Sequence, residues 1–227
     1  ARKIRGIVKK TPLQESLNYS QKYNSKIFFK REDLQDVKSF KIRGAYTKIL
    51  SVEKTIAQNG LVCASAGNHA QGFAVSCSLL DYNGTVFMPH STPSLKVSLV
   101  KKFGGKNIKI KLVGENFSKA YKAAMDYCIR NRKTFIHPFD DIKVIEGQAT
   151  LFLEVIEQIK NPIDYIFIPI GGGGLISGAI NIFKQLSPKT KIIGIEPAGA
   201  PSMKESIIKN KIIKLHKIDN FVDGAAV

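Results

Sequence analysis

The chain of 227 residues has no tryptophan, only three cysteines and 18 acidic residues against 35 basic ones. The odd number of cysteines, with no Cys-x-x-Cys pair, argues against a disulfide framework and favours a reducing compartment, so we expect a cytoplasmic protein. Cys63, Cys77 and Cys128 each lie in an apolar segment, and we expect them to be small core residues. No apolar run approaches the roughly 20 residues that cross a bilayer, so no membrane partner is expected.

The excess of basic residues gives a net charge of +17, which raises the question of a nucleic-acid partner. The lysines are spread along the whole chain, and no dense basic tail or aromatic-interleaved patch is present. We therefore expect no nucleic-acid partner. A polyanion-binding role is kept as the lowest-ranked alternative, and it would require an affinity that falls steeply with salt.

Apolar segments typical of strands alternate with segments of helical pattern. Strands are expected at residues 27–29, 61–64, 85–88, 108–113, 165–170 and 192–195, and helices at 44–52, 68–80, 93–103, 117–129, 144–159 and 175–186. The strands at 165–170 and 192–195 are apolar throughout, as in strands buried on both faces of a parallel sheet. Repeated units of strand, loop and helix predict an α/β fold with doubly wound, mostly parallel sheets.

Lys41 lies in the segment Ser-Phe-Lys-Ile-Arg-Gly-Ala at residues 39–45. Two loops further along the chain have the setting of ligand-binding turns, Ser-Ala-Gly-Asn-His-Ala-Gln-Gly at residues 65–72 and Gly-Gly-Gly-Gly-Leu at residues 171–175. A lysine amine that can lose its charge, together with a loop that binds phosphate, is what a Schiff-base cofactor enzyme requires.

Four consecutive glycines follow an apolar strand and precede a helix: Gly171, Gly172, Gly173 and Gly174. A helix N-terminus offers unpaired N–H groups and the positive end of a dipole, and glycines let the backbone close around a phosphate. The dinucleotide pattern Gly-x-Gly-x-x-Gly fails in every register, although Glu196 lies at the distance of a ribose-binding acid, and no Walker lysine follows. The loop therefore predicts a monophosphate site, with a tight strand–helix turn as the alternative.

The loop at residues 65–72 is rich in hydrogen-bond donors. Ser65, the main chain of Gly67, Asn68 and His69 stand at the start of a helix, where a carboxylate would bind. Asn68 could bond a cofactor hydroxyl or cap its helix, and both interpretations stay open. His69 could be catalytic or a loop histidine with a satisfied hydrogen bond.

In their order along the chain, the three motifs resemble those of the threonine dehydratase and serine racemase group of fold-type II pyridoxal-phosphate enzymes. The resemblance covers essentially the whole chain and includes His-Pro-Phe-Asp-Asp at residues 137–141. The closing Val-Asp-Gly-Ala-Ala-Val at residues 222–227 resembles the biosynthetic dehydratases. The family resemblance implies a C-terminally truncated catalytic domain. Its large lobe would comprise residues 1–43 plus 138–227 and its small lobe residues 44–137, with no regulatory domain. A homodimer or homotetramer is expected.

The resemblance also implies the cofactor and the residues that hold it. Pyridoxal 5'-phosphate would be attached covalently to Lys41, with Phe40 against its ring and Asn68 bonded to the ring hydroxyl. The phosphate would be held by Gly171, Gly172, Gly173, Gly174 and Leu175. The carboxylate of an amino-acid substrate would be held by Ser65, Gly67, Asn68 and His69.

The implied reaction converts L-threonine to 2-oxobutanoate and ammonia, the first step of isoleucine biosynthesis, and L-serine to pyruvate. Lys41 must be neutral to take the α-proton, so its pKa must fall from about 10.4. Racemases of the group have a second serine where this chain has Ala66, which favours elimination. Ser202 stands where metal-binding members have an acid, so no metal is expected. The alternatives are a serine racemase or β-replacement enzyme, and, from another class, an inactive truncated module that binds a ligand or a partner chain.

Overall fold

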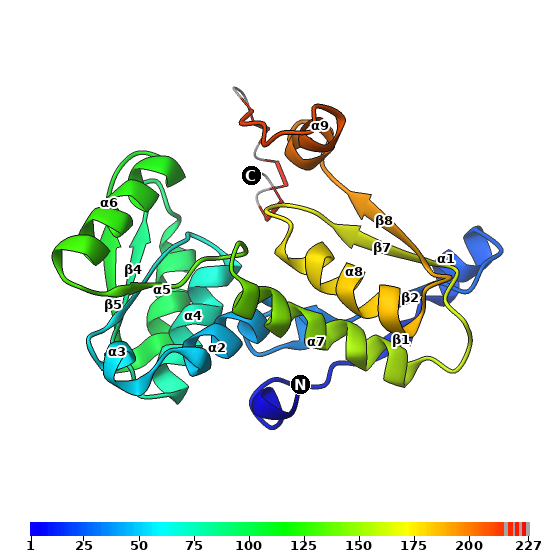
Figure 1. Cartoon of the computed structure of the whole chain (residues 1–227), viewed down its shortest axis with the longest axis horizontal. Coiled ribbons are helices and arrows are strands. Elements are labelled where there is room, and N and C mark those ends of the chain that lie inside the picture. Colours follow the sequence, from blue (N-terminus) through cyan, green and yellow to red (C-terminus); the bar gives the residue numbers. More distant parts are fainter. Residues whose placement is uncertain (216–217, 220, 223, 226–227) are drawn as a thin grey trace.

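The computed structural model describes residues 1–215, 218–219, 221–222 and 224–225. A four-stranded parallel sheet in the order β5-β4-β3-β6 occupies one end of the molecule, and the parallel pair β7-β8 occupies the other (Figure 1). β1 and β2 form an antiparallel pair. The strands are β1 (Leu13–Glu15), β2 (Phe28–Lys30), β3 (Leu61–Ala64), β4 (Gly84–Met88), β5 (Ile108–Leu112), β6 (Thr134–Phe135), β7 (Tyr165–Pro169) and β8 (Lys191–Ile195).

The long helix α7 connects the two ends, and α8 lies beside it (Figure 1). α2 packs between α4 and α7. The α-helices are α1 (Leu17–Lys22), α2 (Lys41–Ser51), α3 (Lys54–Gln58), α4 (Asn68–Leu79), α5 (Ser94–Gly104), α6 (Phe117–Arg130), α7 (Ile142–Gln158), α8 (Gly174–Leu186) and α9 (Ser202–Ile208). The 3-10 helices are η1 (Arg2–Ile4), η2 (Glu32–Leu34) and η3 (Gly105–Asn107). The predicted α/β class with parallel sheets is confirmed.

The four-stranded sheet has the most complete core. All residues of β3 and β4 are buried, as expected for central strands covered by helices on both faces. Cys63 lies on β3, Cys77 on α4 and Cys128 on α6, and all three are free, buried thiols. The prediction that the cysteines are core residues is therefore confirmed.

The prediction that the strands at 165–170 and 192–195 are buried on both faces is wrong for this structure. Ile168 of β7 is only 2% exposed because it faces the core formed with α7 and α8. Its neighbour Phe167 is 66% exposed, and Tyr165 and Ile195 are also exposed. Successive side chains of a strand point to opposite faces, and within the described part of the chain helices cover only one face of this pair.

α2 begins at Lys41, three residues earlier than the sequence pattern predicts, so the predicted cofactor lysine is the first residue of a helix. Gly44 lies inside this helix because α7 crosses it closely. A Cβ at Gly44 would lie 2.3 Å from the side-chain nitrogen of Gln148, and one at Gly147 would lie 2.4 Å from the carbonyl oxygen of Arg43. The short elements α1, α3, α9, β1 and β6 have no counterpart among the elements predicted from the sequence. Among the described residues, no helix is long and apolar enough to cross a membrane.

Candidate active site

Lys41 projects from the first turn of α2. Its Nζ atom donates a hydrogen bond to the carbonyl oxygen of Pro138 at 2.9 Å and lies 5.5 Å from the centre of the Phe40 ring. Burial disfavours the charged amine and lowers the pKa of Lys41 from 10.5 to about 8. The side chain is thus an amine that can be neutral near physiological pH, as the sequence analysis required.

The loop at residues 65–67 joins the end of β3 to the start of α4. The backbone N–H of Gly67 donates to the hydroxyl oxygen of Ser65 at 3.2 Å, and nothing lies within 4 Å of the place where a Cβ of Gly67 would be. Asn68 is the first residue of α4 and is exposed, and the N-cap position before it is occupied by Gly67. The capping interpretation of Asn68 is therefore not supported, and its amide is available to a ligand.

His69 follows on the first turn of α4 and is buried. Its Nε2 atom lies 3.1 Å from the carbonyl oxygen of Ile136, so this nitrogen carries the proton, while the buried Nδ1 has no partner in the described part of the chain. Burial, and then the charge of Lys41, lower the pKa of His69 to about 3. The imidazole is therefore neutral, with one satisfied nitrogen and one buried acceptor that no described residue partners.

The glycine loop leads into α8. Gly173 has a φ of 82°, a left-handed conformation that favours glycine. A Cβ at Gly172 would lie 2.3 Å from the Phe139 ring, and one at Gly174 would lie 2.8 Å from the Phe139 carbonyl oxygen. Leu175 packs against the core of α7 and α8. The glycines therefore form the turn before α8 and leave room for Phe139 to pack against it. The glycine pattern in the sequence does not predict this packing role.

Residues 136–140 connect the predicted site residues. Ile136 contacts His69, Pro138 accepts from Lys41, and Phe139 lies on the glycine loop. His137 holds this turn in shape, because its Nδ1 accepts hydrogen bonds from the backbone N–H groups of Phe139 and Asp140 at 3.3 and 2.8 Å. The motif at residues 137–141 was visible in the sequence, but nothing in it indicated this connecting role.

The residues present fit a phosphate-bearing aldehyde cofactor. Lys41 supplies an amine of lowered pKa. The glycine loop forms the N-terminus of the thirteen-residue helix α8, where backbone N–H groups favour an anion such as phosphate. Near the lysine, the buried Nδ1 of His69 and the buried Oγ of Ser39 have no hydrogen-bond partner within the described residues. Buried polar atoms without partners are uncommon, and a bound ligand is one way to supply them.

The acid Glu196 lies outside this constellation. The Glu196 carboxylate accepts from the backbone N–H groups of Met203 and Lys204, both at 2.8 Å, so it stabilises the start of α9. In the described part of the chain, no group of three acidic, histidine or cysteine side chains could hold a metal.

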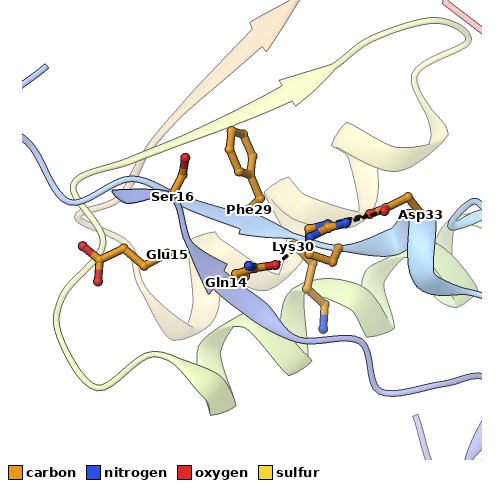
Figure 2. A pocket seen from close by; sticks show the side chains of 7 residues that line it. Gln14, Glu15, Ser16, Phe29, Lys30 and Asp33 are labelled. Atoms are coloured by element: carbon orange, nitrogen blue, oxygen red, sulfur yellow. Dashed lines mark hydrogen bonds and ion pairs between the residues drawn. The ribbon is translucent and has the colours of Figure 1, made fainter. Parts of the chain in front are cut away.

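A surface pocket on β1 and β2 contains none of the predicted site residues (Figure 2). It is lined by Gln14, Glu15, Ser16, Phe29, Lys30, Arg31 and Asp33.

The family model described as pyridoxal-phosphate dependent enzyme matches residues 4–227. The chain is 51% identical over 224 residues to the biosynthetic L-threonine dehydratase IlvA of Halalkalibacterium halodurans, and 49% identical over 224 residues to that of Bacillus subtilis. Each alignment covers 99% of this chain, with 54% and 53% of the respective relative. The chain thus spans about half the length of the curated relatives it matches. Of the closing motif, residues 223, 226 and 227 lie outside the described residues.

Solved structures of proteins named threonine deaminase and serine racemase also match this chain. The processed form of threonine deaminase isoform 2 from Solanum lycopersicum matches with a TM-score of 0.94 at 40% identity, covering 99% of this chain and 61% of that one. Maize serine racemase matches with a TM-score of 0.93 at 32% identity, covering 100% of this chain and 68% of that one. The resemblance inferred from the sequence motifs is confirmed.

Proposed function

The chain belongs to the pyridoxal-phosphate-dependent enzymes, and we propose that it is the catalytic part of a threonine ammonia-lyase. The proposed reaction converts L-threonine to 2-oxobutanoate and ammonia, and L-serine to pyruvate and ammonia. The observation that carries the proposal is Lys41, an amine whose pKa burial lowers to about 8 and whose Nζ donates to the carbonyl oxygen of Pro138, in the turn that contacts His69 and the glycine loop. The identities of 51% and 49% to biosynthetic threonine dehydratases support the choice of substrate.

In this proposal residues of α2, α4 and the start of α8 would hold the cofactor. Lys41 holds it covalently, Phe40 lies against its ring, Asn68 bonds its hydroxyl, and the glycine loop with Leu175 holds its phosphate. When bound, pyridoxal phosphate supplies an aldehyde that condenses with amines and a ring that stabilises negative charge on the neighbouring carbon. The exposed position of Asn68 at the start of α4 and the backbone at the start of α8 support these assignments.

The chain's own residues bind the substrate and move its proton. The substrate carboxylate lies at Ser65, Gly67, Asn68 and His69, at the N-terminus of α4, where backbone N–H groups favour an anion. The neutral Nζ of Lys41 accepts the α-proton, and its lowered pKa keeps a usable fraction of the amine uncharged near pH 7. His69 remains neutral and adds no positive charge beside that amine.

Ala66 favours elimination over racemisation. Racemisation needs a proton donor on the face of the substrate opposite the lysine, and a methyl group at position 66 has no exchangeable proton. We therefore propose that the α-proton is removed and returned on the Lys41 side alone, so that loss of the β-hydroxyl is the main outcome.

The test is release of 2-oxobutanoate from L-threonine by the chain loaded with pyridoxal phosphate. Lys41→Ala should abolish release, and Lys54→Ala, at an exposed lysine of α3, should leave it unchanged. Borohydride reduction should leave the mass of the cofactor on the Lys41 peptide. Release that persists in Lys41→Ala would sink the assignment, and D-serine formed from L-serine would favour a racemase.

Three further parts of the proposal concern the whole protein. We propose a cytoplasmic location, supported by three free, buried thiols, and a homodimer or homotetramer, for which the apolar face of β7 and β8 that no described helix covers offers a surface. We also propose that residues 44–137 act as the small lobe and residues 1–43 plus 138–227 as the large one. Sedimentation equilibrium across a concentration series tests the oligomer.

A further inference from the structure

A buried cluster of charges lies beneath the first turn of α2, on elements far apart in the sequence. Arg43 is 0% exposed and pairs with Glu32 of η2 and Glu154 of α7. Lys30 of β2 pairs with the same Glu154 at 2.5 Å. Two cations thus face two carboxylates, so the charges balance.

Every N–H group of the Arg43 guanidinium has an acceptor. Nε and Nη2 each donate to Glu32 at 2.8 Å, and Nη1 and Nη2 donate to Glu154 at 2.7 and 2.9 Å. Nη1 also donates to the hydroxyl of Thr150 at 3.2 Å. The planar fork therefore binds two carboxylates in a bidentate manner, an arrangement that the point charge of a lysine cannot reproduce.

The two carboxylates are themselves held from other directions. Thr11 donates to Glu32 at 2.5 Å, and Lys30 donates to the carbonyl oxygen of Thr11 at 2.6 Å. Figure 2 shows the Lys30 side chain directed away from the Phe29 ring, so its amine leaves the surface pocket for this cluster. The acceptors of Arg43 therefore have few alternative positions.

The cluster sits on the side of α2 opposite Lys41. Residues two apart on a helix differ by roughly 200° in direction, so Arg43 and Lys41 project from opposite sides. Gly72 of α4 confines the Lys41 side, since a Cβ there would lie 3.0 Å from the Lys41 carbonyl carbon, and Gly147 of α7 contacts the Arg43 carbonyl. Fixing the rotation of this turn on one side therefore fixes the direction of Lys41 on the other.

We propose that Arg43 is a positioning residue, whose bidentate pairs with Glu32 and Glu154 set the rotation of the first turn of α2 and thereby aim Lys41 at Pro138 and the ligand-binding loops. A buried ion cluster is weak evidence for stability as such, because apolar side chains often replace one without loss. Orientation is the property that a bidentate fork supplies and an apolar contact does not.

The inference rests on the proposed function for the importance of Lys41, so its test includes a readout that needs no cofactor. Competitive acetylation with acetic anhydride across pH 6–11, read by tandem mass spectrometry, gives the reactivity and titration midpoint of each lysine. Borohydride trapping of pyridoxal phosphate gives the rate of capture at Lys41. Thermal unfolding is followed in parallel.

Arg43→Lys keeps the charge and removes the fork. We expect cooperative unfolding to persist, the rate of cofactor capture at Lys41 to fall at least tenfold, and the Lys41 midpoint to rise from about 8 towards 10.5. The matched control is Arg31→Lys, the same change in an exposed pair with Asp33. It should change the rate of cofactor capture less than twofold and leave the titration midpoint of Lys41 in place. A folded Arg43→Lys chain with unchanged capture and midpoint overturns the proposal.

If Arg43→Lys does not unfold cooperatively, Glu154→Gln decides, with Glu157→Gln in the exposed pair with Lys10 as its control. The same shifts in Glu154→Gln support the proposal. Loss of folding in both variants would make the cluster a requirement for folding alone and would also overturn it. Failure of the unaltered chain to capture pyridoxal phosphate at Lys41 would instead overturn the proposed function, and the acetylation midpoint would still decide on positioning.

Discussion

A Cβ atom at position 172 would lie 2.3 Å from the ring of Phe139, so these residues can touch as they do only because position 172 is glycine. Gly172→Ala should therefore push Phe139 off the glycine loop, with a loss of stability of about 1–3 kcal/mol. Capture of pyridoxal phosphate should weaken as well, because the neighbouring Pro138 carbonyl contacts Lys41. Thermal unfolding and borohydride trapping measure the two effects.

Two further variants separate this collision from a general effect of alanine. Gly67→Ala places a methyl group where nothing lies within 4 Å, and it should leave the unfolding temperature nearly unchanged. In a Phe139→Ala background, Gly172→Ala should cost little more, because the ring it strikes is gone. Equal losses in both backgrounds would contradict the contact.

Lys41 should make the stability of the folded chain depend on pH in the alkaline range. Burial lowers its pKa from 10.5 to about 8, so between these values the unfolded chain binds a proton that the folded chain has released. Stability from this group therefore rises with pH across that window. Lys41→Met should stabilise by about 2–3 kcal/mol below pH 8, with the gain vanishing near pH 10.5. Urea unfolding at both ends of the window, with the exposed-site variant Lys54→Met for comparison, measures the difference; a constant gain would be inconsistent with a titrating Lys41.

His69 should contribute to instability in acid. Burial and the charge of Lys41 lower its pKa from 6.5 to about 3, so the unfolded imidazole takes up a proton below pH 6.5 while the folded one stays neutral. Stability from this group is complete above pH 6.5 and is lost as the pH falls towards 3. His69→Gln should therefore lose less stability between pH 7 and pH 4 than the unaltered chain. His90→Gln, at an exposed histidine, should show the original slope, and the same slope in His69→Gln would refute the assignment.

The two faces of β7 should respond oppositely to truncation. Phe167→Ala removes a ring that is 66% exposed and should change stability by less than about 1 kcal/mol. Ile168→Ala, next to it on the covered face, should cost about 2–4 kcal/mol. Chemical unfolding of both variants tests this, and comparable losses would mean that the outer face is covered.

The sequence predicted most of the parallel strands, because runs such as residues 61–64 are apolar and bounded by helical segments. It placed the start of α2 at residue 44, three residues after the observed start at Lys41. Glycine is a poor helix former, and only the close crossing of α7 explains why Gly44 lies inside this helix. The sequence pattern overestimated the burial of β7 because periodicity shows that a side chain is apolar, and only the arrangement of helices shows whether that side chain is covered.

Within the site, the sequence indicated Lys41 and both loops, because their residue types and spacing are local. It could not indicate that Lys41 contacts Pro138, or that Arg43 contacts Glu154, because these pairs are separated by 97 and 111 residues. Such contacts arise only when α2 packs on α7 and on the turn that precedes α7, and no local pattern encodes their partners.

The positions of the three thiols have a practical consequence. Burial raises the pKa of Cys128 to about 11 and also raises the pKa values of Cys63 and Cys77. Alkylating reagents need an accessible thiolate, so each cysteine reacts only while its surroundings are transiently open. Because all three lie around the four-stranded sheet, on β3, α4 and α6, alkylation rates report how often that end of the molecule opens and are silent about the end built on β7 and β8. The native chain thus carries its own kinetic probes of local opening, with no label to introduce.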